Sequence, residues 1–146
     1  MKKQIYYEEV TIGAELPVLT KETTIIQMGR WAGASGDYDP LHYDRGIAQE
    51  MGFPDAIVQG KLKSAYLTQL VTDWMGAEGW LKKFSCQHRR ADLCRQEMIM
   101  KGKVTNKHVK EGEHLIECEI HSETPQGEKT TIGKAVVVLP TKESVA

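Results

Sequence analysis

The stretch "SGDYDPLHYD", from Ser35 to Asp44, packs three aspartates and one histidine around a proline. Asp39 precedes Pro40, which keeps its backbone out of the α region, and its side chain can bond its own backbone in an Asx-turn. Asp37 and His42 are then left five residues apart across a proline turn, which can place both side chains on one side. Such a pair suits proton transfer, because one group can accept a proton while the other donates one.

Two other interpretations of this stretch compete with the acid–base pair. A polar loop, in which the aspartate and the histidine only satisfy backbone donors, stays open on the sequence alone. A metal site is disfavoured, because a calcium loop beginning at Asp37 needs glycine at its sixth position and glutamate at its twelfth. Those positions hold His42 and Ala48, and the two-histidine spacing of zinc sites is missing. The chain also lacks glycine-rich nucleotide-binding loops and the G-x-S-x-G context of a serine nucleophile.

Bulk properties limit the classes of protein to which the chain can belong. Its 146 residues, with a formal net charge of −1, fit one domain over residues 1–146 and give no indication of nucleic acid or an anionic membrane as partner. No apolar run reaches the roughly 18 residues of a membrane span, and "MKKQIYYEEV" lacks the apolar part of a secretory signal. Cys86, Cys94 and Cys118 are odd in number without metal-type spacing, so we expect reduced thiols and a cytoplasmic protein.

The turn needs elements that hold it in place, and apolar spacing predicts two helices around it. Thr23 or Thr24 can cap a short helix that ends near Gly33. A longer helix is expected over Ala56–Met75, with Asp55 as its cap, because apolar side chains recur there at spacings of three and four: Leu62, Tyr66, Leu67, Leu70, Val71 and Trp74.

The second half of the chain changes to a period of two, which indicates strands. Alternation or β-branched residues mark four segments, namely Phe84–Arg89, Met98–Val104, Ile116–His121 and Thr130–Pro140. "VKEGEH" and "TPQGEK" supply turns between them, so the strands are expected to be antiparallel. The long helix has to cover one face of that sheet, since neither element can bury its apolar side alone, and this predicts an α+β fold.

"ASGDYDPLHYD…A…GFPDAIVQGKL" resembles the hydratase motif of the MaoC-like dehydratases, the (R)-specific enoyl-thioester hydratases. Their pattern is roughly A-S-G-D-x-N-P-x-H-x-D, followed by G-F and I-x-H-G-M. The resemblance covers about Thr24–Leu70, and "RRADLCRQEMIMKGKVTNK" is more loosely similar to the family's later strands. It implies a hot-dog fold, in which a long central helix is wrapped by an antiparallel β-sheet, and a homodimer or a higher oligomer of dimers.

Carried over by position, the resemblance implies that Asp37 and His42 form the catalytic pair. The family adds or removes water across the C2–C3 double bond of an acyl thioester, carried by coenzyme A or by an acyl-carrier protein, with no metal or organic cofactor. The thioester oxygen gains negative charge in this reaction and needs preorganised donors, which the backbone at a helix start can supply. Gly60 matches the family's glycine at that place, where the missing side chain lets the thioester approach the backbone.

Some residues depart from the family pattern or lie outside it. Asp39 stands where the family has asparagine, while Gln59 and Lys61 replace histidine and methionine on either side of the glycine and bear on substrate binding. A basic cluster is either a solvated face or a contact for coenzyme A phosphates or phosphopantetheine, with Arg89 and Arg90 as the phosphate contacts; its members are Lys82, Lys83, Arg89 and Arg90. No catalytic role is assigned to four scattered histidines: His88, His108, His114 and His121.

Three functions stay open on the sequence. The first is an acyl-thioester hydratase or dehydratase, the second is a hot-dog acyl-CoA thioesterase, and the third is a non-catalytic acyl-binding subunit of a hetero-oligomer. The intact spacing of Asp37 and His42 favours the first over the third. The hydratase-type loop around Pro40 favours the first over the second.

Overall fold

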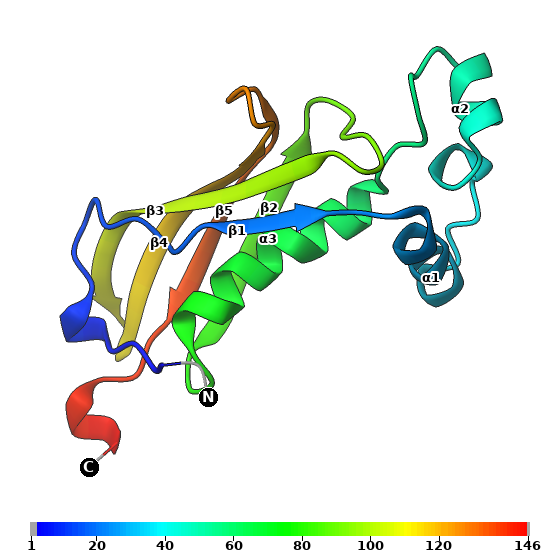
Figure 1. Cartoon of the computed structure of the whole chain (residues 1–146). Coiled ribbons are helices and arrows are strands. Elements are labelled where there is room, and N and C mark those ends of the chain that lie inside the picture. The colour runs from blue at the N-terminus through cyan, green and yellow to red at the C-terminus, as the bar shows by residue number, and fades with distance from the viewer. Residues whose placement is uncertain (1–2, 146) are drawn as a thin grey trace.

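A computed structural model describes residues 3–145 and shows a curled antiparallel sheet along one long helix, α3 (Figure 1). The sheet order is β1-β3-β4-β5-β2, with antiparallel pairing between neighbours. This arrangement confirms the predicted α+β class. In chain order the elements are η1 (Tyr7–Glu9), β1 (Leu19–Glu22), α1 (Ile25–Ser35), η2 (Pro40–His42), α2 (Arg45–Glu50), α3 (Gly60–Met75), β2 (Trp80–His88), β3 (Glu97–Lys110), β4 (Glu113–Glu123), β5 (Lys129–Val138) and η3 (Lys142–Val145).

The core lies between α3 and the inward face of the sheet. The helix buries residues at the predicted spacings of three and four, and the strands bury every second residue, because these are the periods at which side chains share a face. Full burial of one such side chain contributes about 1.5–3 kcal/mol. From the helix these are Leu62, Tyr66, Leu67, Leu70, Val71 and Met75, and from the strands Met98, Met100, Val104, Ile116, Cys118, Ile120, Ala135 and Val137.

Helix α3 begins four residues later than the sequence predicts, at Gly60 instead of Ala56. The reason is a backbone pairing with the segment that follows β2. The N–H of Val58 donates to the carbonyl of Asp92, and the N–H of Cys94 donates to the carbonyl of Ala56, both at 2.8 Å. Asp55 therefore does not cap α3, and its carboxylate instead accepts from the N–H of Ala56 at 2.8 Å.

The elements that carry the proline turn lie beyond one end of the sheet, beside the N-terminal end of α3 (Figure 1). Helix α1 begins as predicted after Thr24, whose hydroxyl accepts from the N–H of Gln27. It ends at Ser35, two residues past the expected end, where Gly36 takes a left-handed φ of 76°. This conformation suits glycine, which has no side chain to clash, and it turns the chain towards Asp37.

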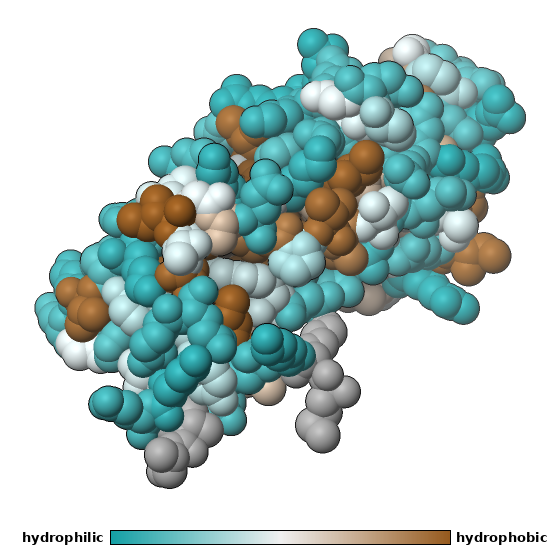
Figure 2. All heavy atoms as spheres, turned by 60° about the vertical axis from the view of Figure 1, so that its left-hand side comes forward, coloured by the Kyte–Doolittle hydropathy of each residue, from teal (hydrophilic) through white to brown (hydrophobic). Residues whose placement is uncertain are grey.

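The surface in Figure 2 is mostly hydrophilic and the cysteines are unpaired. On the face in Figure 2, hydrophobic side chains form separate patches within a largely hydrophilic surface. Cys86, Cys94 and Cys118 are free thiols. Within residues 3–145, no helix is long and apolar enough to pass through a bilayer.

Candidate active site

Asp37 and His42 converge across the proline turn. Their nearest side-chain atoms, Oδ2 of Asp37 and Nε2 of His42, are 3.7 Å apart. The turn is held by Asp39, whose carboxylate caps η2 by accepting from the N–H of Leu41 at 3.1 Å, which confirms the predicted Asx-turn. The His42 side chain is 12 % exposed and that of Asp37 is 40 % exposed, so the pair joins a sheltered imidazole to a carboxylate that water can reach.

A backbone carbonyl determines which nitrogen of His42 carries the proton. Nδ1 of His42 lies 2.8 Å from the carbonyl oxygen of Ile57. A carbonyl oxygen can only accept, so Nδ1 is the donor, and in the neutral ring Nε2 holds a free lone pair. This lone pair is on the nitrogen that faces Asp37. The carbonyl of Ile57, three residues before α3 begins, thus leaves Nε2 of His42 as the nitrogen that can accept a proton.

Gly60 is the first residue of α3, so it lies at a helix N-terminus, where the family resemblance places the backbone donors. The first intrahelical bond runs from the N–H of Lys63 to the carbonyl of Gln59, so the N–H groups of the first turn have no acceptor within the helix. A side chain at Gly60 would meet the ring of His88, since an added Cβ would lie 3.0 Å from Cδ2 and 3.1 Å from Nε2. A side chain at position 60 would therefore press on His88, whose ring would have to shift by a few tenths of an ångström.

The two residues that flank Gly60 have different environments. Gln59 is fully buried, and its Nε2 donates to the carbonyl of Met28 at 2.9 Å, which ties α1 to the start of α3. Its Oε1 is buried without a hydrogen-bond partner in the described part of the chain. Lys61 is exposed. Gln59 therefore acts as a structural link in this geometry, and Lys61 is free to meet a ligand from solution.

A buried ion pair fastens the first turn of α3 to the segment after β2. Nζ of Lys63 lies 2.7 Å from Oδ2 of Asp92, with both side chains only 3 % exposed, and it also donates to the carbonyl of Arg90 at 2.8 Å. Sequence reasoning missed this pair, because a lysine in an amphipathic helix normally indicates the solvent face. A buried charge needs a partner and further hydrogen bonds, and Lys63 has both.

His88, at the end of β2, was assigned no role from the sequence, yet it lies against Gly60. Its Nε2 is 3.3 Å from Oγ of Ser64, and its Nδ1 is 3.1 Å from Oγ1 of Thr131. Burial lowers the pKa of His88, and the positive charge of Lys63 lowers it further. A signal was available in the alternation of β2, because Phe84 and Cys86 share the face of His88 and pack against the core.

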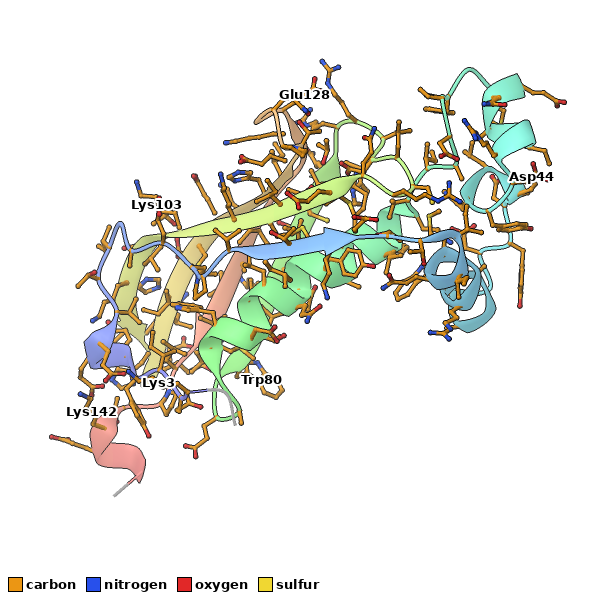
Figure 3. All side chains as sticks on the ribbon, viewed as in Figure 1. Lys3, Asp44, Trp80, Lys103, Glu128 and Lys142 are labelled. Carbon is orange, nitrogen blue, oxygen red and sulfur yellow. The ribbon has the colours of Figure 1, made fainter. Side chains whose placement is uncertain are left out.

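The predicted basic cluster divides between the two ends of β2. Arg89 and Arg90 follow His88 directly, with Nε of Arg90 2.9 Å from Oε1 of Glu128. Lys82 instead forms an ion pair with Glu113 near the start of the strand. Figure 3 shows Glu128 and Trp80, the first residue of β2, at opposite ends of the sheet. Of this cluster, only the two arginines lie at the end of the sheet that is next to Gly60.

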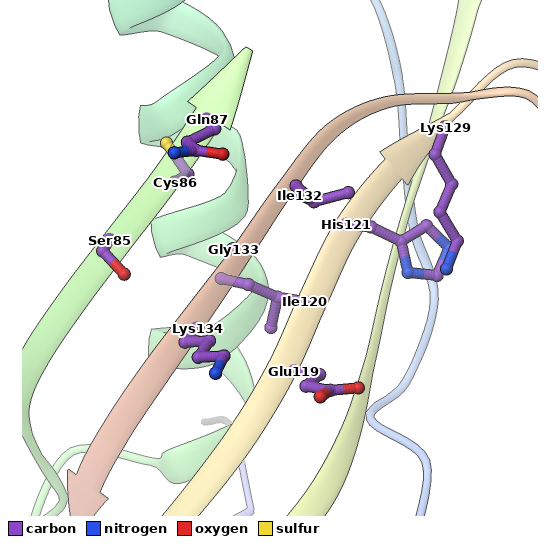
Figure 4. A pocket seen from close by; sticks show the side chains of 10 residues that line it. All are labelled: Ser85, Cys86, Gln87, Glu119, Ile120, His121, Lys129, Ile132, Gly133 and Lys134. Atoms are coloured by element: carbon purple, nitrogen blue, oxygen red, sulfur yellow. The ribbon is translucent and has the colours of Figure 1, made fainter. Parts of the chain in front are cut away.

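A hollow of about 570 Å³ lies elsewhere, across β2, β5 and β4 (Figure 4). It is lined by side chains of both charges, such as Glu119 and Lys134, which are cross-strand neighbours. None of the residues predicted for the site lines it. We therefore place the candidate active site at the proline turn and the start of α3, on the basis of chemistry and not of volume.

Comparisons with known proteins bear on the family and the fold of the chain. The profile of the MaoC-like domain matches residues 9–119. The (R)-hydratase from A. caviae involved in PHA biosynthesis has a TM-score of 0.80 and 24 % identity, covering 91 % of this chain and 99 % of that one. The R-hydratase PhaJ1 from Pseudomonas aeruginosa has a TM-score of 0.85 and 20 % identity, covering 95 % of this chain and 88 % of that one. The ChsH1–ChsH2 complex from Mycobacterium tuberculosis has a TM-score of 0.77 and 22 % identity, covering 88 % of this chain and 98 % of that one. Curated protein sequences give no match. The chain has the hot-dog fold and belongs to the MaoC-like domain family.

Proposed function

We propose that the protein is a hydratase or dehydratase that adds or removes water across the C2–C3 double bond of an acyl thioester. The observation that carries the proposal is the pair of Asp37 and His42, 3.7 Å apart, with the free lone pair of Nε2 facing the carboxylate. This separation is longer than a direct hydrogen bond. One water placed beside it can therefore bond to both groups, which is the arrangement that general acid–base catalysis requires.

The hydration step follows from these positions. The water oxygen bonds to C3 while Nε2 of His42 takes one of its protons, and the π electrons move through C2 to the thioester oxygen. The N–H of Gly60 and the helix N-terminus stabilise that negative charge. The carbonyl then re-forms as C2 takes the proton from the imidazolium, which Asp37 has stabilised meanwhile. One water is consumed and the pair returns to its first state; dehydration is the reverse.

The carrier of the acyl group is proposed to be coenzyme A or an acyl-carrier protein. Arg89 and Arg90 support this, because both are exposed and directly follow His88, the last residue of β2, which lies against Gly60. A guanidinium can bond a phosphate with two N–H groups, although Arg90 would first have to leave Glu128. Lys61 adds a third exposed positive charge at the same end.

A homodimer is proposed from the open edge of the sheet. Strand β2 pairs with β5 on one side, and within the described residues it has no strand on the other. An edge strand of nine residues presents unpaired N–H and C=O groups, which a second copy can satisfy by antiparallel pairing. A single domain over residues 1–146 and a cytoplasmic location stay predictions from the sequence.

Enoyl-coenzyme A esters of increasing chain length test the function directly. Loss of the absorbance of the conjugated thioester reports hydration, which is the expected result. Release of free thiol without that loss would instead identify a thioesterase. Binding of the esters with neither reaction would identify a non-catalytic acyl-binding subunit, and both of these results would contradict the proposal.

A further inference from the structure

His88 and Gly60 face one another closely enough to share a ligand atom. An added Cβ on Gly60 would be 3.1 Å from Nε2 of His88, so Nε2 lies within about 4.6 Å of the glycine Cα, allowing a bond length of about 1.5 Å. Hydrogen-bond donors lie about 2.7–3.1 Å from the oxyanion that they stabilise, so two donors can share one oxygen when they are up to roughly 6 Å apart. The backbone N–H of Gly60 and Nε2 of His88 meet this condition.

The neighbours of His88 determine where its proton lies. The hydroxyl of Ser64 donates its single hydrogen to the carbonyl of Gly60 at 3.1 Å, so the Ser64 oxygen is an acceptor towards Nε2 of His88. Thr131 then donates to Nδ1. This assigns the hydrogen of the neutral ring to Nε2, the atom nearest Gly60. The bond from Nε2 to Ser64 is long, at 3.3 Å, and is easily exchanged for a better acceptor.

The charges around His88 favour this neutral, donating state. Lys61 and Lys63 face it from α3, and Asp92 faces it from the segment after β2. Burial and the two lysines lower the pKa of His88, which outweighs the opposite effect of Asp92. The candidate site therefore contains two histidines with opposite proton placement. His42 presents a lone pair and His88 presents an N–H.

We propose that His88 is a second hydrogen-bond donor to the thioester oxygen, acting together with the backbone N–H of Gly60. This rests on the proposed hydratase function and deepens it, because it assigns the developing negative charge to two donors from different elements. When the substrate binds, Nε2 exchanges Ser64 for the thioester oxygen. The bond strengthens as charge grows on that oxygen, so it stabilises the transition state more than the bound substrate.

The first test is kinetic. His88→Ala should lower kcat for enoyl-coenzyme A hydration by about 10²-fold, the usual loss when one oxyanion donor is removed. His88→Gln keeps an N–H donor and should recover part of the loss. His108→Gln is the matched control, because His108 lies on β3 beside Glu117 and is not one of the residues of the candidate site, and it should retain the parent rate. A parent-like kcat in folded His88→Ala would overturn the proposal.

The second test separates this proposal from the proposed function. Butyryl-coenzyme A has the thioester but no double bond, so it can bind without being hydrated. Isotope-edited infrared spectra of the bound ester should show the carbonyl stretch at lower frequency in the parent and in His108→Gln than in His88→Ala. Equal frequencies in all three, or no binding of the ester, would overturn the role of His88. A parent that shifts the stretch but hydrates no enoyl ester would refute the hydratase function alone.

Discussion

The two ends of α3 bury different kinds of side chain. The N-terminal end buries Gln59 and Lys63, each bonded to a group outside the helix. The C-terminal half buries only hydrocarbon and thioether side chains against the sheet, such as Leu70, Val71 and Met75. Apolar burial contributes free energy in proportion to its area, whereas a buried ion pair repays little more than its own desolvation. The difference teaches that one end stabilises the fold and the other positions the side chains of the candidate site.

The largest effect is expected on turnover, at the turn beside the polar end. Asp37→Asn and His42→Ala should each lower kcat by about 10²-fold or more, since positioned acid–base groups contribute about 10²–10⁴. Thermal unfolding should change much less, because neither side chain belongs to the core. Asp39→Asn is the control: it keeps an acceptor for the N–H of Leu41 and should leave turnover largely intact. Parent rates in the first two variants would refute the acid–base role.

The buried ion pair gives the next largest effect, on stability. Lys63→Met should lower the free energy of unfolding by about 3–5 kcal/mol, because it leaves the carboxylate of Asp92 buried and unpaired. The double variant Lys63→Met/Asp92→Leu should recover most of that loss in urea denaturation. Turnover should stay reduced in the double variant, because the segment after β2 loses its side-chain bond to the first turn of α3 and keeps only the backbone bonds to Ala56 and Val58. Full recovery of both the unfolding free energy and turnover would remove the distinction between the two ends of α3.

A cavity in the apolar half of α3 should lower stability and leave turnover unchanged. Leu70→Ala removes a side chain that is 2 % exposed and should cost about 2–5 kcal/mol of unfolding free energy. The kcat of the folded fraction, measured well below the unfolding temperature, should stay near that of the parent. A large loss of kcat without unfolding would show that the apolar end also positions the site.

The smallest effect is a pH dependence of stability. The pKa of His88 is lowered in the folded protein, so below its unfolded value of about 6.5 the unfolded chain binds more protons at this site. Stability should therefore fall as pH drops from about 6.5 towards the folded pKa. His88→Gln should remove this part of the slope in denaturation series at several pH values; an unchanged slope would contradict it.

The sequence predicts the local features of the fold well. Thr24 as a cap, Asp39 in an Asx-turn and the apolar stripe of α3 each depend on residues close in the chain, and the structure confirms them. The predicted start of the long helix, at Ala56, was wrong because of contacts with residues distant in the chain. Ala56 and Val58 are apolar enough for a helix, but they pair with backbone from more than thirty residues away.

The candidate site was predictable only in part, for the same reason. The spacing of Asp37 and His42 indicates a pair because one turn contains both. The contact of His88 with Gly60 and the partnership of Lys63 with Asp92 form only when β2 folds back beside α3. Strand β1 was also missed, because four residues with one half-buried face carry too short a pattern.

The bond from His42 to the carbonyl of Ile57 has a consequence for how this protein can evolve. A side-chain partner could be lost by a single substitution, but every amino acid at position 57 supplies a carbonyl. Drift at that position therefore leaves the proton on Nδ1 unless the backbone itself moves. In the proposed hydratase, neighbouring positions can then vary the acyl groups accepted while His42 keeps its protonation, so selectivity and chemistry are separately mutable.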